Sequence, residues 1–551
     1  MSDGYPVMGI VCAMSAGLEV PLTQWMSVDW RFLIPLEEMR CVSYVPAPPP
    51  HERRVLEICG VRVLAAAPGQ RDPDVVIAVQ PSGRPAPGAP VPAAASSAPY
   101  VLLRLGAQRR SVWARLTYAS LKAWRKRLAS NGFEVRAAYW HAPSEERCSY
   151  LVDLDDRVAI AAMLRRYHDV RFGWAKSVVA RSVSRFRLSA QLARDVTLVV
   201  QPRRDVVTGP SALDRPLSSD PMTAALGGEE RASQLLVTPW FEASRHVLCL
   251  YMDGRGSLTA VAKMPRRPGD IDGIRHEAEV LRTLARTEAL AGHLPVVLEL
   301  SMGAKPYLLE TALRGRAADP GTVRAHGDGI VDAGLDFLAR LPTTSSTTSD
   351  ATWFTRLIEE PLSDIAARVA LPSMPALVQE TLARLEPLRQ RSLPLVAEHG
   401  DLSHPNLMLD KRGQLLAVDW ERSNLRGIPG HDLFFLLQYV AEARHDTFER
   451  VGQLAAFDDA FVGPTGWARP WLQRYAAGLG LSAEILPALL LATWARSSAG
   501  LATRVAAQTK GGVTALGGPI QRSDTLAIAF AEDRDHALWS HALKRFDELL
   551  S

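Results

Sequence analysis

Cysteine is scarce in this chain, and its spacing is irregular. The 551 residues include only five cysteines, and no two of them are arranged as C-x-x-C. Closely spaced cysteines mark structural zinc sites, and even-numbered sets mark the disulfide frameworks of small secreted domains. The sequence therefore argues against both kinds of site as organisers of the fold.

Long apolar runs and a strong charge of one sign are also missing. The longest apolar runs, residues 433–441 and 485–495, are shorter than the roughly 20 residues that cross a bilayer. The residues after Met1 lack the basic segment and apolar core of a secretion signal. The net charge is only +4, with 47% hydrophobic and 22% charged residues. We expect a cytoplasmic globular protein without a nucleic-acid or membrane partner, and the sequence leaves its oligomeric state open.

A chain of this length is expected to form two or three domains. Residues 80–99 are rich in Pro, Ala, Ser and Gly, which is typical of a surface loop. Residues 202–230 are a second polar segment between two structured patterns. We therefore predict an N-terminal domain of residues 1–201, a linker at 202–230, and a second domain of residues 231–551.

The first half alternates short β-like runs with helical patterns, which favours an α/β, Rossmann-like layer structure. We expect strands at residues 55–58, 75–79, 100–103 and 133–140, with a helix at 111–129 that ends at Asn131-Gly132. From about residue 30 to 200 the order resembles the later part of a class I methyltransferase domain.

A cofactor site of that class implies a glycine-rich turn after the first strand. Here Ile58-Cys59-Gly60 runs directly into residues 61–63. We therefore expect this half to be structural or regulatory and not to bind S-adenosylmethionine. The alternative is that it methylates or glycosylates a substrate.

The second half contains the segment that carries chemistry. Apolar residues 407–409 and 414–418, separated by Lys-Arg-Gly, predict a β-hairpin. With its turn near residue 412, antiparallel pairing places Asn406 opposite Val418 and beside Asp419. Asp401 lies five residues before Asn406, on the loop that enters the same end.

An amide oxygen and a carboxylate at one point make a hard oxygen site of the kind that Mg²⁺ accepts together with water and phosphates. A nearby carboxylate, Asp401, can orient a substrate hydroxyl and accept its proton. These are the groups that phosphoryl transfer needs. Chance agreement of His-Gly-Asp, the following Asn and Asp-Trp is improbable, so we interpret Asp401, Asn406 and Asp419 as functional.

This segment resembles the aminoglycoside phosphotransferase and choline kinase family. The resemblance covers residues 235–545 and implies an α+β, two-lobed protein-kinase-like domain with a small lobe at about 231–312 and a large lobe at about 313–551. It implies ATP or GTP and Mg²⁺ as cofactors, Asp401 as base, and Asn406 and Asp419 as metal ligands. Asp432 matches an aspartate that braces the loop of Asp401.

The small lobe of such a domain needs a strand lysine and a helix glutamate for the nucleotide phosphates. Lysine is rare here, with eight in the chain, and Lys263 ends a strand-like run. The helical pattern that follows from residue 274 carries Glu277, with Glu279 as the alternative.

Two further nucleotide contacts are expected. Residues 305–311 look like an edge strand leading to a hinge, where backbone groups from Glu310 to Ala312 would meet the base. Residues 239–246 occupy the place of the phosphate-covering loop but contain no glycine. Ser244 is the candidate phosphate contact there.

The acceptor is expected over the large lobe, between Asp401 and helices within residues 325–390 and 465–550. An aminoglycoside, a sugar, an amino alcohol and a natural-product hydroxyl all remain compatible acceptors, because such pockets are built from variable helices. The alternative to an enzyme is a nucleotide-binding scaffold that regulates the first half.

Overall fold

The computed structural model describes most of the chain, with gaps. It describes residues 22–34, 39–64, 73–81, 98–106, 118–142, 148–167, 193, 195–203, 233–238, 245–303, 305–344, 352–447, 449–510, 527 and 530–551. The chain divides into two compact units. The sheet unit comprises residues 20–271 and 297–312, and the helical unit comprises residues 1–19, 272–296 and 313–551.

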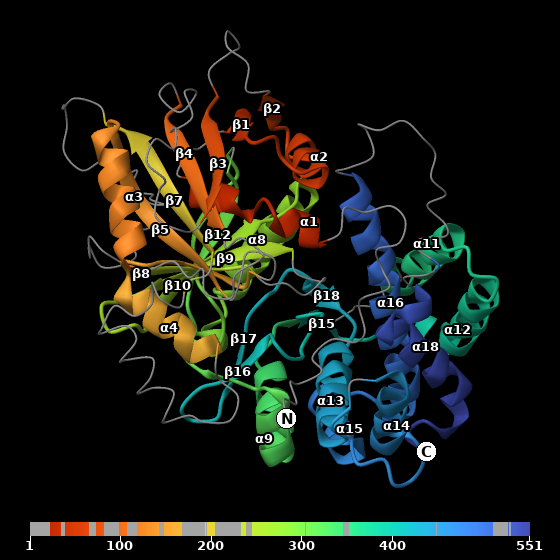
Figure 1. Cartoon of the computed structure of the whole chain (residues 1–551). Coiled ribbons are helices and arrows are strands. Elements are labelled where there is room, and N and C mark those ends of the chain that lie inside the picture. Colours follow the sequence, from red (N-terminus) through yellow and green to blue (C-terminus); the bar gives the residue numbers. More distant parts are fainter. Residues whose placement is uncertain are drawn as a thin grey trace. The chain divides into compact units, whose positions relative to one another are not determined.

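The sheet unit is built on one twelve-stranded sheet, with the order β11-β12-β10-β9-β8-β6-β5-β7-β4-β3-β1-β2 among the described residues (Figure 1). Strands β1 to β4 are parallel where they pair, and every other neighbouring pair is antiparallel. The strands are β1 (Cys41–Val45), β2 (Arg62–Leu64), β3 (Val75–Pro81), β4 (Tyr100–Gly106), β5 (Phe133–Ala142), β6 (Tyr150–Asp153), β7 (Asp195–Pro202), β8 (Ser233–Val237), β9 (His246–Met252), β10 (Leu258–Pro265), β11 (Val297–Ser301) and β12 (Tyr307–Thr311).

Both faces of this sheet are covered by apolar side chains, as the two-residue period of a strand requires. Leu102 packs into one core cluster, whereas its neighbours Val101 and Leu103 pack into the other. Each cluster contains residues from before residue 203 and from after residue 232. The helices of this unit are α1 (Leu22–Met26), α2 (Pro50–Ile58), α3 (Tyr118–Ser130), which packs on β5, and α4 (Arg157–Tyr167), which packs on β6 and β8 (Figure 1).

Two expectations about this unit are wrong. Residues 55–58, expected as a strand, belong to α2, because Pro50 occupies its first turn and the apolar run supplies its buried face. The parallel part of the sheet begins instead with β1, where the sequence analysis had predicted no strand. Residues 305–311, expected at an edge, include β12, which lies between β10 and the edge strand β11.

The expected linker at residues 202–230 lies almost wholly outside the described residues and stays a prediction. The strands on either side of it belong to the same sheet. Leu151 of β6 pairs with Leu236 of β8, and Leu236 is fully buried. The compact sheet unit therefore continues across this position.

This continuity predicts that the chain stays together after a cut near the expected linker. If a protease site is inserted within residues 204–232 and cleaved, the two fragments should co-elute in size-exclusion chromatography without denaturant, because separation would expose the edges of β6 and β8. Separate elution of two folded fragments would instead establish independent domains.

Open α/β sheets bind ligands at the carboxyl end of the strand where the strand order reverses. The parallel part of this sheet has such a strand. That strand is β1, flanked by β2 and β3. Four of the five residues 46–50 that follow it are prolines, which have no amide N–H to offer a ligand. The Glu52 carboxylate there accepts hydrogen bonds from the Tyr44 hydroxyl at 2.9 Å and from Arg104 at 3.1 Å.

We therefore expect no S-adenosylmethionine binding at this end of the sheet, because side chains fill it and prolines replace the backbone donors. Calorimetric titration of the full chain checks this expectation, with adenosine as a control for weak stacking. A saturable heat with a micromolar Kd that Glu52→Gln abolishes would show a working cofactor site.

The helical unit surrounds two small sheets, β13-β16-β17 and β14-β15-β18. Helix α13 packs against α9 and α14, and α16 packs against α11, α12 and α18. No single described helix is long and apolar enough to span a bilayer, although one strongly bent pair, Arg469–Gly478 with Ala483–Leu501, meets that criterion jointly. The elements are α8 (Ile271–Leu284), β13 (Arg316–Ala317), α9 (Pro320–Leu338), β14 (Thr343–Thr344), α10 (Thr352–Phe354), α11 (Glu360–Arg368), α12 (Met374–Arg389), β15 (Leu395–Glu398), β16 (Leu407–Leu409), β17 (Leu415–Ala417), β18 (Asn424–Gly427), α13 (His431–Arg444), α14 (Arg450–Phe461), α15 (Arg469–Gly478), α16 (Leu486–Lys510) and α18 (Arg534–Lys544).

Candidate active site

The hairpin formed by β16 and β17 has the predicted register. Leu407 pairs with Ala417, and one step further the Val418 amide donates to the Asn406 carbonyl at 3.0 Å. Asn406 and Asp419 therefore lie at the open end of the hairpin, as the sequence indicated.

Asp401 is reached through a glycine that no other residue can replace without strain. Gly400 has φ of +82°, a left-handed conformation that glycine adopts readily. A Cβ atom on this residue would lie 2.4 Å from the Arg422 carbonyl oxygen. The close approach explains why glycine precedes Asp401.

Asp432 holds this loop in place from the first turn of α13. Its two carboxylate oxygens accept hydrogen bonds from the amides of His399 at 2.6 Å and Gly400 at 2.8 Å. The His399 ring is fully buried, and its Nε2 lies 2.9 Å from the Val418 carbonyl. The loop of Asp401 is thus fastened both to α13 and to the end of the hairpin.

The Asp401 carboxylate has a defined set of partners. The Ser403 hydroxyl donates to Oδ1 at 3.1 Å, and Nη1 of Arg422 lies 3.1 Å from Oδ2. The side chain is 26% exposed, so a substrate hydroxyl can reach it.

The two candidate metal ligands also have constrained geometry. Nδ2 of the buried Asn406 side chain donates to the Asp401 carbonyl at 3.1 Å, so its amide oxygen is the atom that could bind a metal. Asp419 has φ of +70°, which is uncommon for a residue with a side chain and is typical of functional sites. Within the described ranges no cluster of three His, Cys, Asp or Glu residues could hold a metal. Mg²⁺ would not need such a cluster, because it binds through one or two protein oxygens plus water and substrate phosphates.

Glu277, and not its alternative Glu279, points inward from α8. Glu277 is fully buried, and its Oε1 accepts a hydrogen bond from the Trp420 amide at 2.8 Å. Glu279 is exposed. The helix glutamate is therefore tied to the residue that follows Asp419.

Lys263 lies in β10 of the sheet unit and is buried. Its Nζ is 3.5 Å from Oε1 of Glu310 on the neighbouring strand β12. The sequence assigned Glu310 only a backbone role and missed this carboxylate as a lysine partner. The expected pairing of Lys263 with Glu277 stays a prediction.

The other expected nucleotide contacts are only partly visible. The Ala312 amide donates to the Thr259 carbonyl at 3.0 Å, so in this structure it is not available to the base. Ser244 and the rest of residues 239–244 lie outside the described residues. Their role as a phosphate contact stays a prediction.

Sequence reasoning missed two arginines that pair with carboxylates of this segment. Arg422 pairs with Asp401, and Arg496 of α16 makes two hydrogen bonds to Glu398, at 2.6 and 3.1 Å. Arg496 interrupts the apolar stretch of residues 485–495 at its end, and a charge in such a position predicts a buried partner. That signal was available in the sequence, although it could not name Glu398.

The buried His431 ring, beside Arg496, makes stability depend on pH. Burial lowers the pKa of His431 to about 4. From pH 6.5 to 4 the unfolded chain therefore binds a proton that the native site does not, and stability should fall as pH falls, by up to about 3 kcal/mol. Urea unfolding of wild type and His431→Gln at several pH values checks this, because the variant should lose part of the pH slope. An unchanged slope in His431→Gln would contradict the prediction.

Comparison with known proteins gives one match to a family model. Residues 249–475 match the family model described as "Phosphotransferase enzyme family". No curated protein sequence matches the chain.

Solved structures show distant likeness. The aminoglycoside phosphotransferase APH(3'')-Id of Streptomyces rimosus is 20% identical, covers 48% of this chain and 89% of its own, and has a TM-score of 0.29. A choline/ethanolamine kinase family protein from Mesorhizobium loti is 16% identical, with 60% and 96% covered and a TM-score of 0.34. An ethanolamine kinase of Plasmodium vivax is 11% identical, with 56% and 83% covered and a TM-score of 0.34. The family match and the geometry above indicate that residues 249–475 form a kinase-like phosphotransferase domain that is similar to the phosphotransferase enzyme family.

Proposed function

We propose that this domain transfers the γ-phosphoryl group of ATP or GTP to a hydroxyl of a small molecule, with Mg²⁺ as cofactor. The observation that carries the proposal is the open end of the β16–β17 hairpin. There the backbone hydrogen bond from Val418 to Asn406 brings Asp419, the next residue along the chain, to the same end of the hairpin as Asn406. Asp401 is joined to the same amide through its carbonyl.

Each of these residues has a separate role in the proposed reaction. Asn406 and Asp419 would hold Mg²⁺, which neutralises the phosphate charge and keeps the phosphates in line with the acceptor. Lys263 would bind the phosphates as a cation. Asp401 orients the acceptor hydroxyl and takes its proton as the oxygen attacks the γ-phosphorus.

Arg422 and Ser403 prepare Asp401 for this role. Because both carboxylate oxygens already accept from these side chains, the carboxylate is fixed before the acceptor arrives. To accept the substrate proton, a carboxylate oxygen of Asp401 must either bind the acceptor hydroxyl in addition to Arg422 or Ser403 or lose that partner. Positioning of this kind lowers the entropic cost of the reaction.

Nucleotide binding and turnover test the proposal. In calorimetry the full chain should bind the analogue AMP-PNP or GMP-PNP with an affinity that depends on Mg²⁺. In a turnover assay with ATP or GTP it should release ADP or GDP when an acceptor is present. The bound nucleotide should also raise the unfolding temperature of the protein, because it binds the native state and not the unfolded chain. If neither nucleotide binds with Mg²⁺, the proposal is wrong. Tight binding without turnover across a broad acceptor screen would favour a scaffold.

A further inference from the structure

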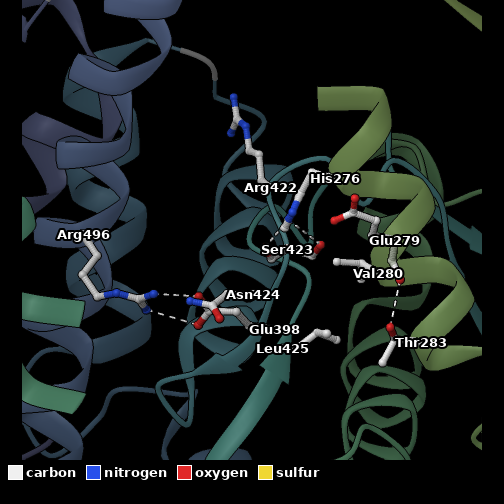
Figure 2. A pocket seen from close by; sticks show the side chains of 10 residues that line it. All are labelled: His276, Glu279, Val280, Thr283, Glu398, Arg422, Ser423, Asn424, Leu425 and Arg496. Carbon is white, nitrogen blue, oxygen red and sulfur yellow. Dashed lines mark hydrogen bonds and ion pairs between the residues drawn. The ribbon is translucent and has the colours of Figure 1, made fainter. Parts of the chain in front are cut away.

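A cavity of about 550 Å³ lies in the helical unit, beside Arg422. Its volume falls in the range of about 300–1,000 Å³ that is typical of small-molecule sites. Figure 2 shows His276, Glu279 and Thr283 of α8 on one side and Arg496 of α16 on another. The described lining residues are His276, Glu279, Val280, Thr283, Glu398, Arg422, Ser423, Asn424, Leu425 and Arg496.

The cavity adjoins the reactive carboxylate. Arg422 is common to both, because it lines the cavity while its Nη1 lies 3.1 Å from Oδ2 of Asp401. The cavity also reaches α16, within the region where the acceptor is expected. A small molecule held here would lie next to the proposed base.

Three of the four charged side chains in the described cavity wall, Arg422, Arg496 and Glu398, are already in ion pairs. The guanidinium of Arg496 makes a two-pronged ion pair with Glu398, in which the side chains are only 11% and 4% exposed (Figure 2). The guanidinium of Arg422 is paired with Asp401. Glu398 therefore offers little attraction to a cationic ligand, because its carboxylate is already bound by the Arg496 guanidinium, which is closer and better oriented.

Glu279 is the one remaining carboxylate among the described lining residues. The backbone carbonyl of Glu279 accepts a hydrogen bond from the Thr283 hydroxyl at 2.9 Å. His276 donates from Nε2 to the Ser423 carbonyl at 2.8 Å. The wall thus combines one surplus negative charge with several neutral polar groups.

We infer that this cavity binds the acceptor, and that the acceptor carries at most one positive charge, as in a neutral sugar, a cyclitol or an amino alcohol. This inference rests on the proposed function. A polycation would bring several ammonium groups against two guanidiniums and a single free carboxylate, and like charges brought together in a desolvated site are strongly unfavourable. Neutral hydroxyls can instead be satisfied by polar groups such as the Asn424 amide.

The test compares probes that differ in charge. The full chain, saturated with Mg²⁺ and AMP-PNP, is titrated with myo-inositol, glucosamine and kanamycin. Kanamycin, with several amino groups, should bind no more tightly than glucosamine. Wild-type binding of kanamycin at least about tenfold tighter than glucosamine would overturn the inference.

Variants of the wall make the test independent of the natural acceptor. Arg496→Gln frees the Glu398 carboxylate, so kanamycin affinity should rise by about tenfold or more. The double variant Arg496→Gln/Glu398→Gln removes both charges. Its affinity for kanamycin relative to glucosamine should return to that of the wild type. Glu279→Gln, at an exposed position that folding tolerates, should weaken glucosamine relative to myo-inositol.

These outcomes separate the inference from the proposed function. Loss of AMP-PNP binding by wild type would refute the proposed function itself. Normal AMP-PNP binding, with no probe bound by wild type and no gain of kanamycin binding in Arg496→Gln, would refute the assignment of the cavity. If Arg496→Gln does not fold, the glucosamine affinity of Glu279→Gln decides whether the acceptor binds in this cavity. A glucosamine affinity equal to that of the wild type would contradict the assignment.

Discussion

Replacement of Asp401 by asparagine should lower kcat by about 10²–10⁴-fold, the range for loss of a positioned general base. The Kd for Mg²⁺-nucleotide should stay within about twofold. The physical reason is that Asp401 contacts Ser403 and Arg422, whereas the proposed metal ligands are other residues. Chemistry and binding should therefore separate in this variant.

The measurement is steady-state ADP release with an identified acceptor, together with calorimetry of AMP-PNP and Mg²⁺. Asp332→Asn is a matched control, because Asp332 is a half-exposed aspartate of the helical unit that also pairs with an arginine, Arg474. It should leave both quantities unchanged. Equal turnover by Asp401→Asn and wild type would show that Asp401 is not the base.

The site itself could be predicted from sequence because its geometry is local. Asn406 and Asp419 are brought together by a hairpin with a short turn, and a turn of that length fixes the register of both strands. Asp401 follows from the same loop. Gly400 is required by the backbone path, since a side chain there would collide with Arg422.

The organisation of the sheet could not be predicted for the opposite reason. The period of two identifies β8 as a strand, but it does not say which strand lies beside it. β8 pairs with β6, although about 80 residues separate Leu151 from Leu236. β1 was missed because its residues are followed by prolines in place of the expected glycine-rich turn.

Long-range charge pairs show the same limit. Nothing near Glu398 in sequence indicates that Arg496 is its partner, since 98 positions separate them. The charge-neutral wall of the cavity depends on this pair. A list of its residues without the pairing would have suggested two free carboxylates, and hence a site for a polycationic acceptor.

Asp419→Asn should remove both turnover, by about 10³-fold or more, and the Mg²⁺-dependent part of nucleotide affinity. Without this carboxylate the triphosphate would face the site with its charge uncompensated, and electrostatic stabilisation of this kind is often the largest single catalytic contribution. Asparagine is the suitable replacement because Asp419 has φ of +70°, and asparagine tolerates the left-handed conformation better than alanine does.

Calorimetry of AMP-PNP with and without Mg²⁺ gives the metal-dependent part directly. Asp446→Asn is the matched control, because Asp446 also has positive φ, +49°, but forms an exposed pair with Arg324. It should bind nucleotide as wild type does, so a fold-wide effect of changing a left-handed aspartate can be separated from loss of the metal ligand. If Asp419→Asn keeps the full Mg²⁺ dependence, Asp419 is not a metal ligand. Since Asp401→Asn is expected to lose chemistry alone and Asp419→Asn to lose chemistry and metal-dependent binding together, the two variants assign the base and the metal site independently.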